Sequence, residues 1–210
     1  MHETAQQVKL MFWNKISPVY DLFENVYNRK VYKGTGIKVA EFLDKSDSVL
    51  ECACGTGEIT VSIAGKCKRL IATDYAEGML KRAAKKCRKY DNVTFLQEDI
   101  TDLRFEDESF DKVVAGNVIH LLPEPRKALD ELTRVVRPDG KIIIPTYINM
   151  SKKSSGFAVK FIEKLGADFK RQFEIGSYKR FFTDMGYDDV EYCVVEGRMP
   201  CAVAVITRKV

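Results

Sequence analysis

The sequence lacks any apolar run that approaches the roughly 20 residues needed to cross a bilayer. It begins without a basic segment followed by an apolar stretch, so we expect no secretory signal. Its net charge of +4 is small for 210 residues, which argues against a dedicated nucleic-acid-binding protein. The content of 45% hydrophobic and 30% charged residues is ordinary for a folded protein. These features favour one folded domain in the cytoplasm.

The six cysteines show no pattern that is typical of a metal site. They lie at positions 52, 54, 67, 87, 193 and 201, and none has a histidine nearby. One residue separates Cys52 from Cys54, whereas paired zinc ligands usually have two or more residues between them. We therefore expect free thiols, with Cys52 and Cys54 packed in their loop, and no metal.

Apolar segments of strand length alternate with segments of helix length over the central part of the chain. The pattern predicts strands at 48–53, 70–74, 93–99, 110–117 and 141–147, with helices at 35–43, 58–65, 76–89 and 125–136. Such alternation is typical of βαβ units and of a parallel sheet covered on both faces. The first thirty residues also look helical, and Pro18 separates two helices there.

The end of the chain departs from this alternation. A helix is predicted at 177–185, stopped by Gly186, and two strands follow within 188–197 and 201–209. Strands joined by so short a turn must be antiparallel. The predicted fold is therefore α/β: a Rossmann-like, doubly wound sheet of seven strands, mostly parallel, with a C-terminal antiparallel hairpin and N-terminal helices.

Polar residues and glycines fall where the predicted strands end. The first strand contains Glu51 and runs into the turn Cys54-Gly55-Thr56-Gly57, and the next three strands end at Asp74, Asp99 and Asn117. Ligands of open parallel sheets bind at the carboxyl ends of the strands. A carboxylate about 20 residues after a glycine turn can accept the hydroxyl groups of a ribose. We expect a nucleoside-containing ligand at this edge.

The charge of the turn favours a cationic nucleoside over a dinucleotide. Dinucleotide loops follow G-x-G-x-x-G and place a diphosphate at the start of the next helix. Here Thr60 replaces the third glycine, and Glu58 stands where the diphosphate would be repelled. S-adenosylmethionine carries a sulfonium and an ammonium group and no phosphate, so carboxylates such as Glu51 are favourable partners.

Four segments resemble the motifs of class I S-adenosylmethionine-dependent methyltransferases. They are VLECACGTGEIT, IATDYAEGML, the stretch from QEDITDL to VIHLLPEP, and LTRVVRPDGKIIIPTY. The N-terminal WNKISPVYDLF is similar to the entry of the ubiquinone- and menaquinone-biosynthesis methyltransferases. The resemblance covers most of the chain and implies S-adenosylmethionine as cofactor, S-adenosylhomocysteine as product and a small-molecule methyl acceptor.

The resemblance implies which residues contact the methionine part of the cofactor. Glu51, Ala53 and Gly55 match the first motif, and Tyr20 matches a tyrosine that closes over the methionine end. Ala53 departs from the family, since a glycine usually stands at this position. Its methyl group should tighten the pocket.

The resemblance also implies which residues contact the adenosine part of the cofactor. Asp74 should hold the ribose, and Tyr75 and Met79 should pack near the adenine. Asp99 should accept a hydrogen bond from the adenine amino group, while the backbone amide of Ile100 should donate one to the ring.

Asn117 and Val118 should line the wall near the sulfonium, and His120 follows them. Because the pKa of histidine suits neutral pH, His120 is a candidate general base. The alternative is a helix-entry residue that faces solvent or the core. No catalytic residue is assigned, since an acceptor that already ionises needs no strong base.

The resemblance implies one domain, 1–210, with four parts: an N-terminal helical lid (1–33), a cofactor-binding core (34–150), substrate-cover helices (151–180) and the hairpin (181–210). The stretch 151–180 has eight basic and three acidic residues. It could receive an anionic or aromatic substrate, touch a membrane surface, or form a solvated helix packed on the core. A monomer and a homodimer both remain open.

Two other functions remain as alternatives: a non-catalytic S-adenosylmethionine-binding protein, and an NAD-dependent oxidoreductase. Glu58, Thr60 and the terminal hairpin disfavour the oxidoreductase.

Overall fold

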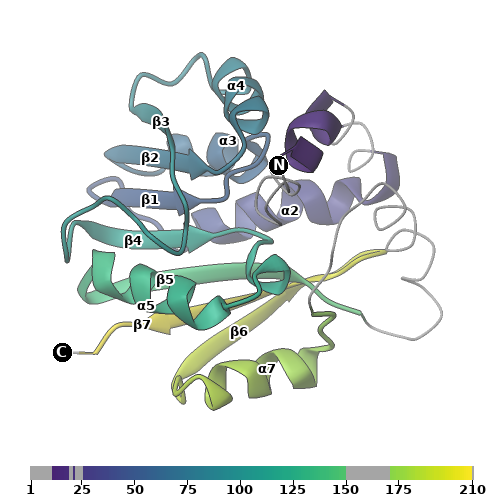
Figure 1. Ribbon diagram of the computed structural model, residues 1–210, viewed down its shortest axis with the longest axis vertical. Coiled ribbons are helices and arrows are strands. Elements are labelled where there is room, and N and C mark those ends of the chain that lie inside the picture. Colours follow the sequence, from purple (N-terminus) through teal and green to yellow (C-terminus); the bar gives the residue numbers. More distant parts are fainter. Residues whose placement is uncertain (1–10, 19–20, 22–25, 150–170, 210) are drawn as a thin grey trace, which may run out of the picture.

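One sheet of seven strands crosses the computed structural model, which describes residues 11–18, 21, 26–149 and 171–209 (Figure 1). The strands are β1 (Ser48–Cys52), β2 (Arg69–Asp74), β3 (Val93–Gln97), β4 (Phe110–Ala115), β5 (Val136–Tyr147), β6 (Val190–Val195) and β7 (Cys201–Thr207). Their order is β3-β2-β1-β4-β5-β7-β6. The strands β1 to β5 are parallel, whereas β7 is antiparallel to both of its neighbours. The predicted fold class is confirmed.

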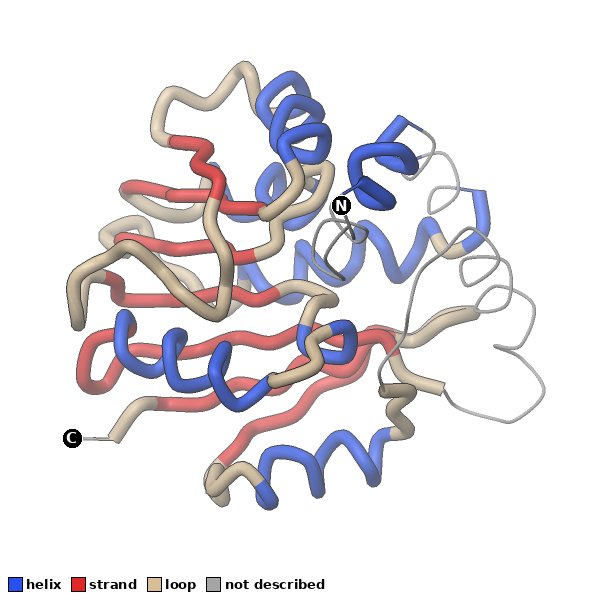
Figure 2. The backbone as a smooth tube through the Cα atoms, viewed as in Figure 1, coloured by secondary structure: helices blue, strands red, loops and turns tan. Residues whose placement is uncertain are grey.

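Helices lie on both sides of this sheet (Figure 2). They are α2 (Arg29–Ala40), α3 (Glu58–Ala64), α4 (Glu77–Lys86), α5 (Pro125–Val135) and α7 (Ile175–Asp184), with a 3₁₀ turn η1 (Ile119–Leu121) and a helix over 11–18. At the start of α7, Glu174 and Ser177 form a capping box that provides hydrogen-bond partners for backbone amides of the first turn. Gly186, with a φ of +84°, follows the last turn of this helix.

The strands are apolar on both faces because each face is covered by helices. In β1, Val49 packs in a core with α2 and α3, while Leu50 packs in a second core with α5 and α7. Both residues are 0% exposed, as expected where side chains alternate between two covered faces. Because both faces of the sheet are covered, a ligand can bind at the carboxyl ends of the parallel strands.

Two of the predicted parallel strands end two residues earlier than expected. The strand predicted at 93–99 ends at Gln97, and the one predicted at 110–117 ends at Ala115. Asp99 and Asn117 therefore lie in loops two residues beyond the strands, and Asn117 adopts a positive φ of 52°. Each side chain accepts a hydrogen bond from a backbone amide there, Asp99 from Thr101 and Asn117 from Tyr147.

The turn predicted at 138–140 lies inside β5, so this boundary was wrong. The pairing of β4 with β5 passes from Phe110–Val136 to Lys112–Lys141, which leaves the intervening residues as an irregularity in the strand. Asp139 takes a φ of 61°, and its amide donates to the carbonyl of Arg208 at 2.9 Å. The residue that follows the antiparallel strand β7 thus holds the turn within the sheet by a backbone hydrogen bond.

Three helices differ from the prediction by two or more residues at an end. The helix predicted at 35–43 is α2 and begins at Arg29, α4 ends at Lys86 instead of residue 89, and α7 begins two residues earlier than residue 177. Most of the segment 151–180 and part of the segment 1–33 lie outside the described residues. Within the described part, no helix combines the length and the apolar character that a membrane crossing requires.

Candidate functional site

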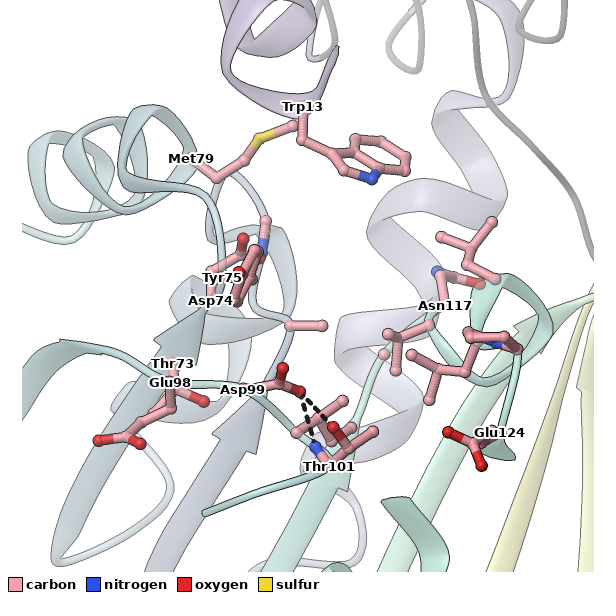
Figure 3. A pocket seen from close by; sticks show the side chains of 18 residues that line it. Trp13, Thr73, Asp74, Tyr75, Met79, Glu98, Asp99, Thr101, Asn117 and Glu124 are labelled. Carbon is pink, nitrogen blue, oxygen red and sulfur yellow. Dashed lines mark hydrogen bonds between the residues drawn. The ribbon is translucent and has the colours of Figure 1, made fainter. Parts of the chain in front are cut away.

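A cavity of about 420 Å³ opens at the carboxyl ends of β1, β2 and β4 (Figure 3). Its volume lies within the range of about 300–1,000 Å³ that is usual for small-molecule sites. Nine of the eleven residues that the sequence assigned to the cofactor line it: Ala53, Gly55, Asp74, Tyr75, Met79, Asp99, Ile100, Asn117 and Val118. Glu51 does not line it, and Tyr20 lies outside the described residues.

The described lining of the cavity is acidic. It contains four carboxylates, those of Asp74, Glu98, Asp99 and Glu124, and no lysine, arginine or histidine among the residues that the structure describes there. Glu98 is paired with Arg104 at 3.0 Å and Glu124 with Lys127 at 2.8 Å. Asp74 and Asp99 accept hydrogen bonds from backbone amides. Such a lining suits a cationic ligand and disfavours a diphosphate.

The turn after β1 forms one wall of the cavity through its backbone. Ala53 and Gly55 both have a φ of 54°, and Gly57 has a φ of 84°. A Cβ on Gly57 would come within 3.0 Å of Ala83 on α4, so this glycine permits close packing of turn and helix. Ala53 holds the left-handed conformation that glycine favours, at a cost of about 1–2 kcal/mol. The strain falls where the family motif has its glycine.

Asp74 joins this turn to the end of β2. Its Oδ2 accepts a hydrogen bond from the Gly55 amide at 2.8 Å, and its Oδ1 accepts one from the Ala76 amide at 2.8 Å. Burial raises the pKa of Asp74 above its ordinary value, although the backbone amides oppose this effect. Each carboxylate oxygen keeps a further lone pair, so Asp74 can accept additional hydrogen bonds from a ligand.

Glu51 lies two residues before Ala53, with 1% of its surface exposed. Its Oε2 is buried without a hydrogen-bond partner. Burial raises the pKa of Glu51 to about 8; hydrogen bonding with Thr60 opposes this effect, and the nearby charge of Asp74 adds to it. A carboxyl group in this environment carries a proton at neutral pH, and a positive charge nearby would favour its ionised form.

The loop after β3 is held by its own hydrogen bonds. Asp99 Oδ1 accepts from the amide of Thr101 at 2.9 Å and from its hydroxyl at 2.7 Å, as the dashed lines in Figure 3 show. Ile100 is 8% exposed. The loop therefore presents the Asp99 carboxylate and the adjoining backbone to the cavity in a fixed geometry.

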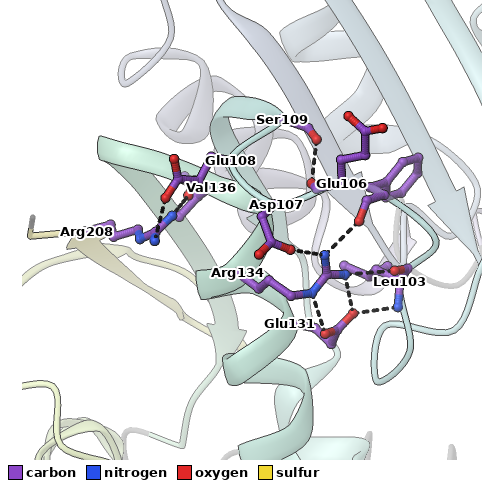
Figure 4. A network of polar contacts seen from close by, with 10 residues as sticks. Leu103, Glu106, Asp107, Glu108, Ser109, Glu131, Arg134, Val136 and Arg208 are labelled. Carbon is purple, nitrogen blue, oxygen red and sulfur yellow. Dashed lines mark hydrogen bonds and ion pairs between the residues drawn. The ribbon is translucent and has the colours of Figure 1, made fainter.

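Arg134 of α5 fixes the chain that continues from this loop (Figure 4). Its guanidinium donates to both oxygens of Glu131 at 2.8 Å, to Asp107 at 2.8 Å, and to the carbonyls of Leu103 and Phe105. Glu131 in turn accepts from the Leu103 amide at 2.7 Å. This planar fork ties the β3–β4 connection to α5.

The loop after β4 forms the opposite wall. The Asn117 amide donates to the carbonyl of Pro145 at 2.8 Å, and its side-chain Oδ1 accepts from the Tyr147 amide at 3.1 Å. These bonds fix the loop to the end of β5. His120 lies in η1 but is only 7% exposed and does not line the cavity. Burial lowers its pKa to about 4, so its assignment as a general base near neutral pH loses support.

Some lining residues were missed by the sequence reasoning. Thr73, Glu98, Thr101 and Gly116 adjoin residues that it named, and the rule of strand ends could have found them. Leu121 ends η1, Leu122, Pro123 and Glu124 follow it, and Trp13 comes from the helix over 11–18. Trp13 begins the N-terminal segment WNKISPVYDLF, but its place in the cavity wall depends on how this helix packs against Ala76 and Met79.

Comparison with known proteins agrees with the cofactor cavity described above. Residues 50–144 match the family described as methyltransferase domain. A demethylmenaquinone methyltransferase of Clavibacter sepedonicus is 36% identical over 142 residues, which are 66% of this chain and 57% of the relative. The chain thus spans less than two thirds of that relative's length.

Two further comparisons cover more of the chain. A demethylmenaquinone methyltransferase of Staphylococcus aureus is 29% identical over 188 residues, covering 80% of this chain and 75% of the relative. The structure of an S-adenosylmethionine-dependent methyltransferase from Thermotoga maritima has a TM-score of 0.73 at 18% identity, covering 95% of this chain and 99% of that one. At this identity the structural match shows the fold.

Proposed function

The chain belongs to the class I S-adenosylmethionine-dependent methyltransferases, and on that premise we propose that it methylates a small molecule and holds the cofactor in the 420 Å³ cavity. The observation that carries the proposal is the acidic lining, together with the buried Glu51 oxygen that has no partner. Both suit a ligand that brings positive charge and no phosphate. When bound, S-adenosylmethionine supplies an electrophilic methyl group on its sulfonium.

The residues of the cavity divide between the parts of the cofactor. Asp74 accepts hydrogen bonds from the ribose, and the loop of Asp99 and Ile100 binds the adenine edge. Tyr75 and Met79 pack near the ring. Ala53 and Gly55 serve the methionine part, and Asn117 and Val118 form the wall beside the sulfonium. Glu51 does not line the cavity, and we assign it to the methionine part through its charge next to the same turn. Tyr20 remains a proposal from the sequence alone.

The acceptor is a small molecule that enters beside the apolar wall formed by Trp13, Val118, Leu121 and Leu122. This wall suits an aromatic acceptor, and the names of the relatives make a quinone-type compound the first to test. The chain contributes by orienting the acceptor and excluding water, which can lower the barrier by several kcal/mol. An acceptor that ionises by itself needs no general base from the protein.

Calorimetric titration with S-adenosylmethionine, S-adenosylhomocysteine and NAD tests the cofactor. We expect both sulfur compounds to bind and NAD not to bind. Asp74→Asn should weaken binding at least about tenfold, because the amide group cannot accept from both Gly55 and Ala76 and loses the charge-assisted bonds to the ribose. The matched control is Asp139→Asn, an exposed aspartate in β5. Unchanged affinity in Asp74→Asn would contradict the placement.

Transfer of a labelled methyl group to a panel of reduced quinones and other small aromatic acceptors tests the activity. Methylation of one acceptor supports the proposed enzyme. Cofactor binding without transfer to any acceptor in the panel would favour the alternative of a non-catalytic S-adenosylmethionine-binding protein. Binding of NAD in place of the sulfur compounds would favour the oxidoreductase.

A further inference from the structure

A cluster of polar side chains outside the cavity joins the N-terminal segment to the glycine turn. Asp21 Oδ1 accepts a hydrogen bond from the hydroxyl of Tyr32 on α2 at 2.7 Å and another from the hydroxyl of Thr56 in the turn. The ammonium of Lys86 on α4 lies 3.1 Å from the same oxygen and 3.2 Å from Glu58 on α3. The Asp21 carboxylate thus bonds directly to α2, α4 and the turn, and Lys86 extends the cluster to α3.

The cluster is shielded from solvent. The side chains of Asp21 and Lys86 are 27% and 25% exposed, and that of Glu58 is 18% exposed. Burial acts to raise the pKa of Asp21, but the hydrogen bonds from Thr56 and Tyr32 and the charge of Lys86 outweigh it and hold the pKa below its ordinary value. Asp21 is therefore ionised at neutral pH, and its bonds to the turn are charge-assisted.

The partner of Asp21 in the turn is next to the cofactor wall. Thr56 is 2% exposed and directly follows Gly55, which lines the cavity and donates its amide to Asp74. A shift of the Thr56 side chain would move the backbone that carries Gly55. The contact thus acts on the cavity without touching a ligand.

The helix over 11–18 precedes Asp21 and carries Trp13 into the cavity wall. Asn14 of this helix accepts a hydrogen bond from the Gly78 amide at 2.7 Å, and Ile16 packs with Met79. Among its described residues, the N-terminal segment is therefore attached to the start of α4 through Asn14 and to the glycine turn through Asp21.

We propose that Asp21 is a positioning residue for the cofactor site, which acts through Thr56 and Lys86 to hold the glycine turn and the Trp13 wall in their binding arrangement. The inference rests on the proposed function, since it concerns the same cavity. Asp21 makes no contact with the reacting groups in this scheme. Its loss should weaken cofactor binding and loosen the wall, while the sheet and its core stay intact.

The test uses the full chain and the fluorescence of its one tryptophan. S-adenosylhomocysteine affinity and quenching of Trp13 by acrylamide are measured for Asp21→Asn and Thr56→Val, with Thr56→Ser as the conservative variant that keeps the hydroxyl. We expect about tenfold weaker binding and greater quenching in Asp21→Asn and Thr56→Val, and near-native values in Thr56→Ser.

The control is Asp47→Asn, which removes the partner of another shielded lysine. Asp47 lies 3.3 Å from Lys112, and the two side chains are 8% and 15% exposed. This variant should lose stability and keep the native quenching of Trp13. A positioning role is overturned if Asp21→Asn and Thr56→Val keep native affinity and quenching, or if Asp47→Asn changes both as much as they do. Failure of the native chain to bind S-adenosylhomocysteine would instead refute the proposed function.

Discussion

Replacing Glu51 with glutamine should have opposite effects on the stability of the ligand-free protein and on cofactor binding. Burial raises the pKa of Glu51 to about 8 from an ordinary value of 4.5, because the residue is 1% exposed; hydrogen bonding with Thr60 opposes this shift, and the charge of Asp74 adds to it. The folded protein therefore keeps a proton that the unfolded chain releases. Glutamine is neutral at every pH and fits the same space.

The sign of the pH dependence follows from this difference. The stability associated with protonated Glu51 is fully present below pH 4.5 and is lost as the pH rises towards 8. One pKa unit corresponds to about 1.4 kcal/mol, so the free energy of unfolding should fall by about 5 kcal/mol over this window. Glu51→Gln should lack this decrease and should be the more stable protein at pH 8.

Urea unfolding of both proteins without ligand, from pH 5 to pH 8.5, measures the difference. Other titrating groups contribute equally to both, so the difference isolates Glu51. The control is Glu191→Gln, an exposed residue of β6, which should follow the native curve. Curves for Glu51→Gln and the native protein that run parallel over this range would refute the reasoning.

The affinity for the cofactor should change in the opposite direction to the stability of the ligand-free protein. A cationic cofactor favours ionised Glu51, so binding to the native protein should release a proton near pH 7, and affinity should rise with pH up to about 8. Calorimetry in two buffers with different heats of ionisation counts the released proton. Glu51→Gln should bind more weakly and release none. Equal affinity and equal proton release in both proteins would show that Glu51 does not sense the charge of the ligand.

Two further substitutions test the loops around the cavity. Arg134→Lys should lower the free energy of unfolding by about 2–3 kcal/mol in urea, since a lysine cannot replace the forked bonds to Glu131 and Asp107, and unchanged stability would contradict the role of the network. Ala53→Gly should raise the free energy of unfolding by about 1 kcal/mol, because glycine takes a φ of 54° without the Cβ strain, whereas Ala202→Gly in β7 should lower it. A loss of stability in Ala53→Gly would show that the left-handed alanine is not strained.

Much of the cofactor edge could be predicted because it depends on local features. Apolar runs separated by helical segments define parallel strands, and the carboxyl ends of parallel strands meet at one edge. Gly55, Asp74 and Asp99 follow consecutive strands, so the sequence alone brings them together, and the structure places all three around the cavity. The family motifs lie on these same strand ends.

The remaining parts depend on contacts between residues that are far apart in the chain. Asp21 and Lys86 are 65 residues apart, and the packing of the helix over 11–18 on α4 decides that Trp13 reaches the cavity. No periodicity encodes such contacts, because they arise only when separate elements pack on one another.

The sequence by itself determined three features: the glycine turn after the first strand, the acidic residues at the strand ends, and the antiparallel hairpin. Only the tertiary structure decided the protonation of the buried groups beside these features. Glu51 and His120 have pKa values of about 8 and about 4, since both are buried, and burial depends on the whole fold around a residue. The strain at Ala53 arises in the same way, because the packed turn imposes a backbone angle that the residue itself disfavours.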